Sequence, residues 1–140
     1  PARPLGEALL DPTRIYVKSC LAAIKAGGVK ALAHITGGGL IENIPRILTD
    51  GLGVDLYAKA WDLPPVFPWL AKAGGIAPHE MARTFNCGIG MVIIASPDHA
   101  ADLQAILREH GETVTPIGEV VARTTGESVV VHDIEEAWKV

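Results

Sequence analysis

Hydrophobic and polar positions recur along this chain with the period of a helix in some stretches and of a strand in others. Asp11-Pro12 opens the stretch up to residue 26, and this pair is typical of a helix start. Asp11 can accept from free backbone N–H groups, and Pro12 has no N–H to leave unpaired. Large apolar side chains then recur at helical spacing, and we expect these to face inward: Ile15, Val17, Leu21 and Ile24. Gly27 and Gly28 end the predicted helix.

The rest of the chain continues this alternation of periods. Further helices are predicted over residues 40–48, 66–73, 78–84 and 96–110, the first of them short or bent because it contains Pro45. Strands are predicted over 29–35, 54–60 and 88–95, the last as a buried central strand, and over 113–121 and 127–132 as a closing hairpin. Trp138 falls in a tail that we expect to be frayed. Helices interleaved with four or five strands predict an α+β fold, in which helices pack on a mixed β-sheet.

Composition narrows the class of protein. The chain has 140 residues, enough for one domain spanning 1–140. A net charge of −4 argues against a nucleic-acid partner, and no apolar run reaches the roughly 20 residues that cross a membrane. Two cysteines without CxxC spacing predict free thiols in a reducing compartment. Because the chain starts at Pro1 without an initiator Met, we expect it to be a piece of a longer protein.

Three glycines join a predicted strand to a predicted helix in residues 33–46. Glycines let main-chain N–H groups come close to a bulky anion, and a helix start adds partial positive charge. The segment therefore predicts a phosphate pocket, with a flexible connector that binds nothing as the alternative. The candidate residues are His34, Thr36, Gly37, Gly38, Gly39, Asn43 and Arg46.

A second informative segment covers residues 78–91. His79-Glu80 resembles the start of the zinc motif HExxH, but position 83 is Arg83, so we predict no metal site. Glu80 and Arg83 could instead form an ion pair on one helix face. Asn86 lies in a turn that leads into a strand, where side chains often meet a ligand. Neither a GxxxxGK[ST] loop nor a GxGxxG fingerprint occurs in the chain.

These two segments resemble the signature stretches of the aminoimidazole ribonucleotide synthetase (phosphoribosylformylglycinamidine cyclo-ligase) family. The resemblance rests on the stretches HITGGG with ENIPR, and HEM with RTFNCG and GM, and residues 5–17 resemble the lead-in to the second domain of that family. It extends over the chain to about residue 132 and covers only the carboxy-terminal domain. It implies a fold that is ferredoxin-like in part.

The resemblance also implies an activity. Family members use ATP and Mg²⁺ to close the imidazole ring of aminoimidazole ribonucleotide in purine biosynthesis, as homodimers in the cytoplasm. The amino-terminal domain, absent here, is expected to bind most of the ATP and Mg²⁺, so this chain alone is expected to be inactive. His34 and His79 are the expected catalytic residues. Thr36, Gly37, Gly38, Gly39, Asn43, Arg46, Arg83 and Asn86 are expected to bind substrate or phosphate.

Two other functions remain open at this point. One is another ATP-dependent enzyme of the same superfamily, such as selenophosphate synthetase, thiamine-phosphate kinase or a hydrogenase-maturation protein. The other is a non-catalytic module that binds a phosphorylated metabolite. The mass of the native protein would separate the enzymes from the binding module, because the cyclo-ligase requires a chain more than twice as long and the module does not.

Overall fold

Helices and strands alternate along the chain in the computed structural model, which describes residues 3–139. The helices are α1 (Leu5–Ala8), α2 (Val17–Ala26), α3 (Gly39–Asn43), α4 (Val66–Gly74), α5 (Pro78–Thr84), α6 (Ala100–Glu109) and α7 (Ile134–Ala137). The strands are β1 (Val29–His34), β2 (Leu52–Tyr57), β3 (Met91–Ala95), β4 (Gly118–Ala122) and β5 (Val129–His132). Short 3₁₀ turns follow α3 and β2 and precede α6, at Ile44–Ile47, Ala58–Ala60 and Pro97–His99. The predicted α+β class is confirmed.

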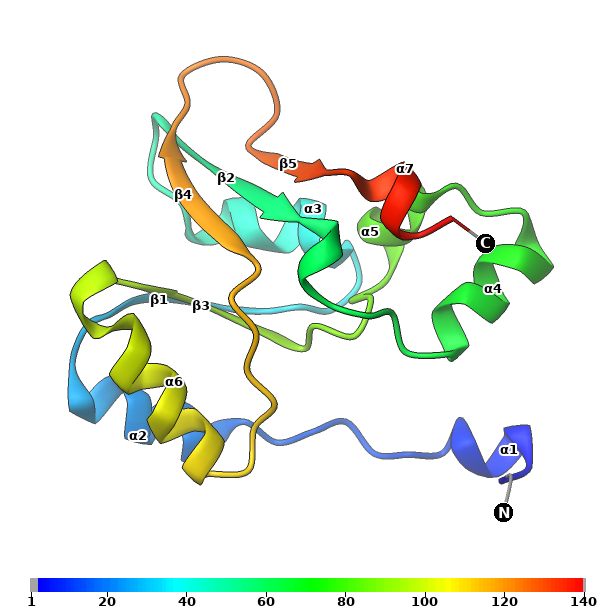
Figure 1. Ribbon diagram of the computed structural model, residues 1–140, viewed down its shortest axis with the longest axis horizontal. Coiled ribbons are helices and arrows are strands. Elements are labelled where there is room, and N and C mark those ends of the chain that lie inside the picture. Colours follow the sequence, from blue (N-terminus) through cyan, green and yellow to red (C-terminus); the bar gives the residue numbers. More distant parts are fainter. Residues whose placement is uncertain (1–2, 140) are drawn as a thin grey trace.

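The strands form two sheets rather than one (Figure 1). β1 and β3 make an antiparallel pair, so β3 is not the buried central strand that its apolar sequence suggested. In the second sheet β2 lies in the middle, antiparallel to β4 and parallel to β5. The predicted hairpin of the last two strands is therefore wrong. β4 and β5 do not pair with each other, because β2 lies between them and takes the hydrogen bonds of both.

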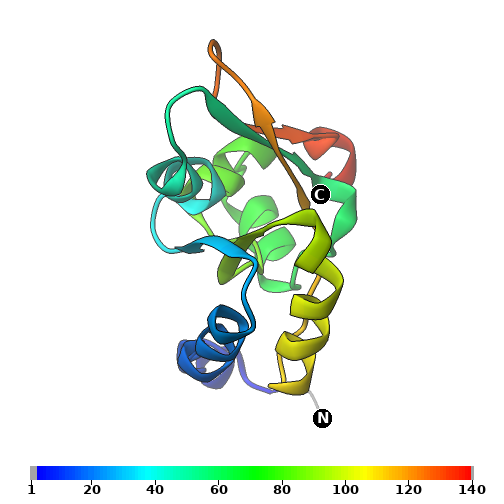
Figure 2. The ribbon, with the colours of Figure 1, turned by 90° about the vertical axis from the view of Figure 1, so that its left-hand side faces the viewer.

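The main core lies between the two sheets, where α3 and α5 run (Figure 1). Leu40 from α3, Leu56 from β2 and Met81 from α5 are almost completely buried there. A smaller core lies on the other side of the β1–β3 pair, where α2 and α6 pack side by side (Figures 1 and 2). Its centre is formed by Ala23, Leu103 and Leu107. None of the described helices is both long and apolar enough to cross a bilayer.

The first long helix differs from its prediction in start and orientation. α2 begins at Val17, and Asp11 pairs with Arg3 instead of capping a helix. The side of α2 that packs on the domain carries Ser19, Cys20 and Ala23, while the large apolar side chains predicted to face inward are exposed. Helical spacing identifies an apolar face but does not say what covers it.

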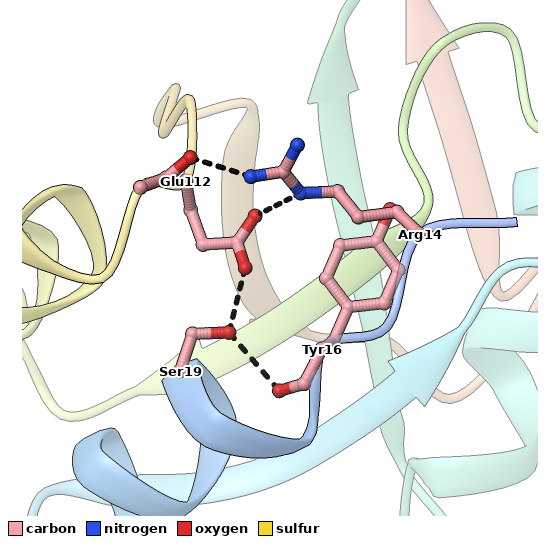
Figure 3. A network of polar contacts seen from close by, with 5 residues as sticks. Arg14, Tyr16, Ser19 and Glu112 are labelled. Atoms are coloured by element: carbon pink, nitrogen blue, oxygen red, sulfur yellow. Dashed lines mark hydrogen bonds and ion pairs between the residues drawn. The ribbon is translucent and has the colours of Figure 1, made fainter.

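Polar contacts fix the segment before α2 to the end of α6 (Figure 3). Arg14 Nε donates to Glu112 Oε2 at 2.6 Å, and an Arg14 terminal nitrogen donates to the Gly111 carbonyl. The second oxygen of Glu112 accepts from the Ser19 hydroxyl at 2.7 Å. Residues 14–19 are therefore held in one place on the domain, which sets the position of Tyr16.

The last described helix, α7, and Trp138 after it are packed rather than frayed. Trp138 is only 4% exposed and meets Trp61 edge to face, with ring centroids 5.4 Å apart. The rings join the end of α7 to the segment after β2, so the prediction for Trp138 is wrong.

Candidate functional site

The glycine loop forms a tight turn between β1 and α3. The Gly39 N–H donates to the Thr36 carbonyl at 3.0 Å, and Gly38 and Gly39 have positive φ angles of 98° and 56°. Thr36 and Gly37 are exposed at the tip. No acceptor within residues 3–139 pairs with the amide N–H groups of Gly37 and Gly38. The tip thus presents main-chain donors to solvent, as the phosphate prediction requires.

Asn43 holds this loop from beneath. Its side chain is buried, and its Nδ2 atom lies 3.2 Å from the Thr36 and Gly37 carbonyl oxygens and 2.8 Å from that of Gly39. A side chain that donates to three carbonyls of one turn fixes the conformation of that turn. We therefore interpret Asn43, which the sequence suggested as a ligand contact, as the support of the loop.

Gly39 brings the glycine loop and the segment of residues 78–91 into contact. A Cβ atom at this position would overlap the carbonyl oxygen of Ala82 and lie 2.6 Å from that of Phe85. Only glycine lets α3 approach the end of α5 so closely. This glycine serves helix packing, and only the outer two glycines of the loop remain for contact with an anion.

The second segment turns sharply after α5. The Asn86 side-chain oxygen accepts from the Gly88 N–H at 3.0 Å, and the Trp61 indole donates to the Cys87 carbonyl at 3.0 Å. Cys87 is fully buried with a positive φ of 49°, and its thiol lies 3.3 Å from the Met81 carbonyl oxygen. Burial raises the pKa of this thiol to about 12. A thiol that stays protonated at neutral pH does not act as a nucleophile.

An open pocket of about 320 Å³ lies between the two segments. It is lined by Ile35, Thr36, Gly37, Phe67, Thr84, Phe85 and Asn86. Phe67 from α4 and Phe85 have ring centroids 6.1 Å apart and supply the apolar part of the wall. The backbone of Gly37, the hydroxyl-bearing side chains of Thr36 and Thr84, and the carboxamide of Asn86 supply the polar part. This combination suits a ligand with a phosphate group and a less polar body.

The two predicted catalytic histidines lie outside the lining of this pocket. His34 ends β1, next to the lining residues, and its exposed imidazole meets the Tyr16 ring edge to face, with centroids 6.1 Å apart. His79 is half-buried in the first turn of α5. The structure therefore places both near the two segments but does not bring their rings together in one cavity.

The two predicted arginines are also outside the pocket lining. Arg46 is exposed on the 3₁₀ turn after α3. Arg83 is exposed on α5, with a terminal nitrogen 3.8 Å from Glu80 Oε1, the pair expected from their spacing. Such an exposed pair holds Arg83 only weakly, so its guanidinium can turn to another anion.

Sequence reasoning missed the aromatic wall of the pocket and one neighbour of His34. Phe67 lies in the helix predicted over residues 66–73 and had no feature that marked it as a site residue, and Thr84 and Phe85 occur only within the RTFNCG stretch. The Tyr16 hydroxyl occupies the space that a Cβ at Gly90 would need. In the sequence, the glycine at position 90 was the only indication that Tyr16 packs there. In the part of the chain that the structure describes, no group of three His, Cys, Asp or Glu side chains could hold a metal ion.

Comparison with known proteins gives concordant matches. Residues 1–131 match the family described as AIR synthase related protein, C-terminal domain. The chain is 53% identical over 131 residues to the phosphoribosylformylglycinamidine cyclo-ligase of Bordetella petrii. That alignment covers 92% of this chain but 38% of the relative, so the chain spans well under half the length of the curated protein it matches.

A solved structure shares the fold. The crystal structure of E. coli HypE, a hydrogenase maturation protein, superposes with a TM-score of 0.67 at 25% sequence identity. The match covers 91% of this chain and 39% of that chain.

Proposed function

This chain belongs to the AIR synthase related protein family as its C-terminal domain, and from that membership we propose that it forms the carboxy-terminal half of a phosphoribosylformylglycinamidine cyclo-ligase. The identity of 53% to a cyclo-ligase, against 25% to the hydrogenase maturation protein, favours this member of the superfamily. The complete enzyme is proposed to be a cytoplasmic homodimer.

The proposed reaction closes an imidazole ring. The γ-phosphoryl group of ATP passes to the formamide oxygen of formylglycinamidine ribonucleotide. An amidine nitrogen then attacks the same carbon, the C–O bond breaks, and phosphate leaves. The products are aminoimidazole ribonucleotide, ADP and phosphate. The described residues do not include a carboxylate cluster suited to Mg²⁺, so no step here is assigned to the metal.

The observation that carries this proposal is the pocket between the two segments. Gly39 contacts the end of α5, and Thr36 and Gly37 of the glycine loop line the same pocket as Asn86, Phe67 and Phe85. We assign the loop tip to a phosphate group, either that of the ribonucleotide or the one being transferred. Asn86, which lines the pocket, is proposed to contact the anion, as are Arg46 and Arg83, whose exposed side chains would have to reach it from outside the lining. Asn43 keeps the loop in shape.

His34 and His79 are assigned to proton transfer or to stabilising developing charge, because an imidazole can act as a proton donor or as a proton acceptor. His34 lies one residue before the pocket lining, on the rigid end of β1. His79 approaches from α5 on the other segment.

The test is a coupled ADP-release assay on the full-length protein, with and without formylglycinamidine ribonucleotide. We expect ADP release to depend on this substrate, and His34→Ala to lower turnover by roughly 10²-fold or more, as for loss of a general acid or base. His110→Ala is the matched control, because His110 is an exposed imidazole at the end of α6, outside both segments. Turnover of His34→Ala within about twofold of wild type would exclude this role for His34.

A further inference from the structure

A row of large apolar side chains lies uncovered on α2 and just before it. Ile15, Val17, Leu21 and Ile24 are 82%, 60%, 51% and 48% exposed. Within α2 they are spaced four and three residues apart, so they lie on one face of the helix. We call these four side chains the α2 apolar face.

The helix therefore has its small residues inside and its large ones outside. Ala23 packs against Leu103 and Leu107 of α6 and Cys20 is also buried, where a free-standing domain would gain more by burying leucine and isoleucine. A continuous exposed row of this kind is typical of an interaction surface rather than of ordinary surface.

The exposed apolar side chains are concentrated at the amino-terminal end. Of the eleven large apolar side chains exposed within the described residues, seven lie between Leu5 and Ile24. α1 buries none of its residues and lies apart from the rest of the domain (Figure 1). The α2 apolar face is nevertheless held in position, because Arg14 and Ser19 are both fixed to Glu112 (Figure 3).

We propose that the α2 apolar face is the docking surface for the domain that precedes this one in the full-length protein. This inference rests on the proposed function, which makes the chain the carboxy-terminal part of a longer enzyme. The matching part of the Bordetella relative is only 38% of its length and corresponds to a C-terminal domain, so the larger part of that protein comes before it. The exposed apolar side chains between Leu5 and Ile24 lie at the amino-terminal end of this domain, which is the end to which a preceding domain would connect. A tethered domain is present at high effective concentration, so a modest apolar surface suffices for docking.

Charge next to the face indicates what the docking domain presents. Lys18 and Lys25 are exposed seven residues apart on α2, along one edge of the face. Neither forms an ion pair within residues 3–139. The partner surface is therefore apolar at its centre, with carboxylates opposite these two lysines.

Thiol labelling can test this surface directly. Leu21→Cys is made in the full-length protein and in the 140-residue chain, and the rate of reaction with a maleimide is measured in each. Cys20 and Cys87 are both buried, and labelling of the two proteins without the substitution gives the background rate to subtract. We expect labelling of Cys at position 21 to be at least about tenfold slower in the full-length protein, because reaction then requires local opening of the interface. Ile24→Cys provides a second position on the same face.

Leu52→Cys is the matched control, because Leu52 is an exposed leucine on β2, outside the α2 apolar face. It should react at the same rate in both proteins. Equal rates at position 21 in the two proteins would overturn the proposal. The proposal would also be overturned if position 21 of the isolated 140-residue chain reacted slowly and the rate fell further as the protein concentration rose. The face would then be covered by a second copy of this chain.

The same full-length samples separate this inference from the proposed function. Ring closure with freely labelled position 21 would refute the docking surface and leave the cyclo-ligase assignment standing. Protection at position 21 without substrate-dependent ADP release would refute the cyclo-ligase assignment and leave the docking surface standing.

Discussion

Gly39 shows how one residue without a side chain connects the two segments that form the pocket. Its neighbours Gly37 and Gly38 lie at the tip of the loop, but Gly39 faces the carbonyl oxygens of Ala82 and Phe85. The three consecutive glycines therefore have two different structural roles. The outer ones leave amides open to solvent, and the inner one lets two helices meet.

Gly39→Ala should destabilise the domain by about 2–5 kcal/mol, from a side chain at positive φ together with overlap on backbone oxygens that cannot move aside. Urea denaturation of the 140-residue chain would measure this loss. Gly37→Ala is the control, because a Cβ at Gly37 meets nothing within 4 Å, and it should change the free energy of unfolding little. Equal destabilisation by the two substitutions would contradict this role of Gly39.

At the scale of elements, the three-stranded sheet carries a polar network on the face opposite the core. Asp55 on β2 accepts from Arg123, which follows β4, at 2.5 Å, and His132 on β5 lies 3.2 Å away. The Tyr57 ring stacks on His132, with centroids 5.4 Å apart. These contacts run across all three strands, so they help to join β4 and β5 to the strand between them.

The ion pair predicts a pH-dependent contribution to stability. Burial raises the pKa of Asp55, but hydrogen bonds from Arg123 and His132 outweigh burial and hold that pKa below its usual value. A carboxyl whose pKa is lower in the folded state stabilises the fold above its unfolded pKa of about 3.9, and this contribution is lost as the pH falls through the folded value.

Arg123→Met should therefore lower the urea midpoint at neutral pH. Below about pH 4 the midpoints of the variant and the wild type should approach each other, because Asp55 becomes protonated in both. Arg108→Met serves as the comparison, because Arg108 donates to the neutral acceptors Gln104 and the Val114 carbonyl. Its effect should not follow the titration of a carboxyl group. If the difference in urea midpoint between wild type and Arg123→Met stayed constant from neutral to acid pH, this would argue against the ion pair.

On the scale of the whole molecule, the pocket is open on one side and the α2 apolar face has no cover. Both observations agree with a domain that works against another part of a longer chain. Enzymes that transfer phosphoryl groups exclude water from the reacting atoms, which an open pocket cannot do.

The isolated 140-residue chain should consequently show no ring closure and no substrate-dependent ADP release, while the full-length protein shows both. The measurement is the same coupled assay at matched concentrations of the two proteins. Any turnover by the isolated chain above the uncatalysed rate would mean that the described pocket is sufficient.

Much of the fold could be predicted from local pattern. α5 has the predicted bounds, β1 ends within one residue of its predicted end, and the helix before Pro45 is short, as expected, and passes into a 3₁₀ turn. Strand pairing was predicted wrongly, because the order of β4, β2 and β5 depends on contacts between residues far apart in the chain. For the site, the two segments were found from glycines and polar residues, whereas Phe67 was missed because its contribution comes only from where α4 packs.

The sequence by itself determined the α+β class, the family resemblance and the two segments that meet at the pocket, since these depend on local spacing and on residue types. Only the tertiary structure decided that Asn43 and Gly39 support the loop and that the apolar side of α2 faces outward. An apolar periodicity specifies that a helix has a face to bury, but the surface that buries it is set by the packing of the rest of the protein.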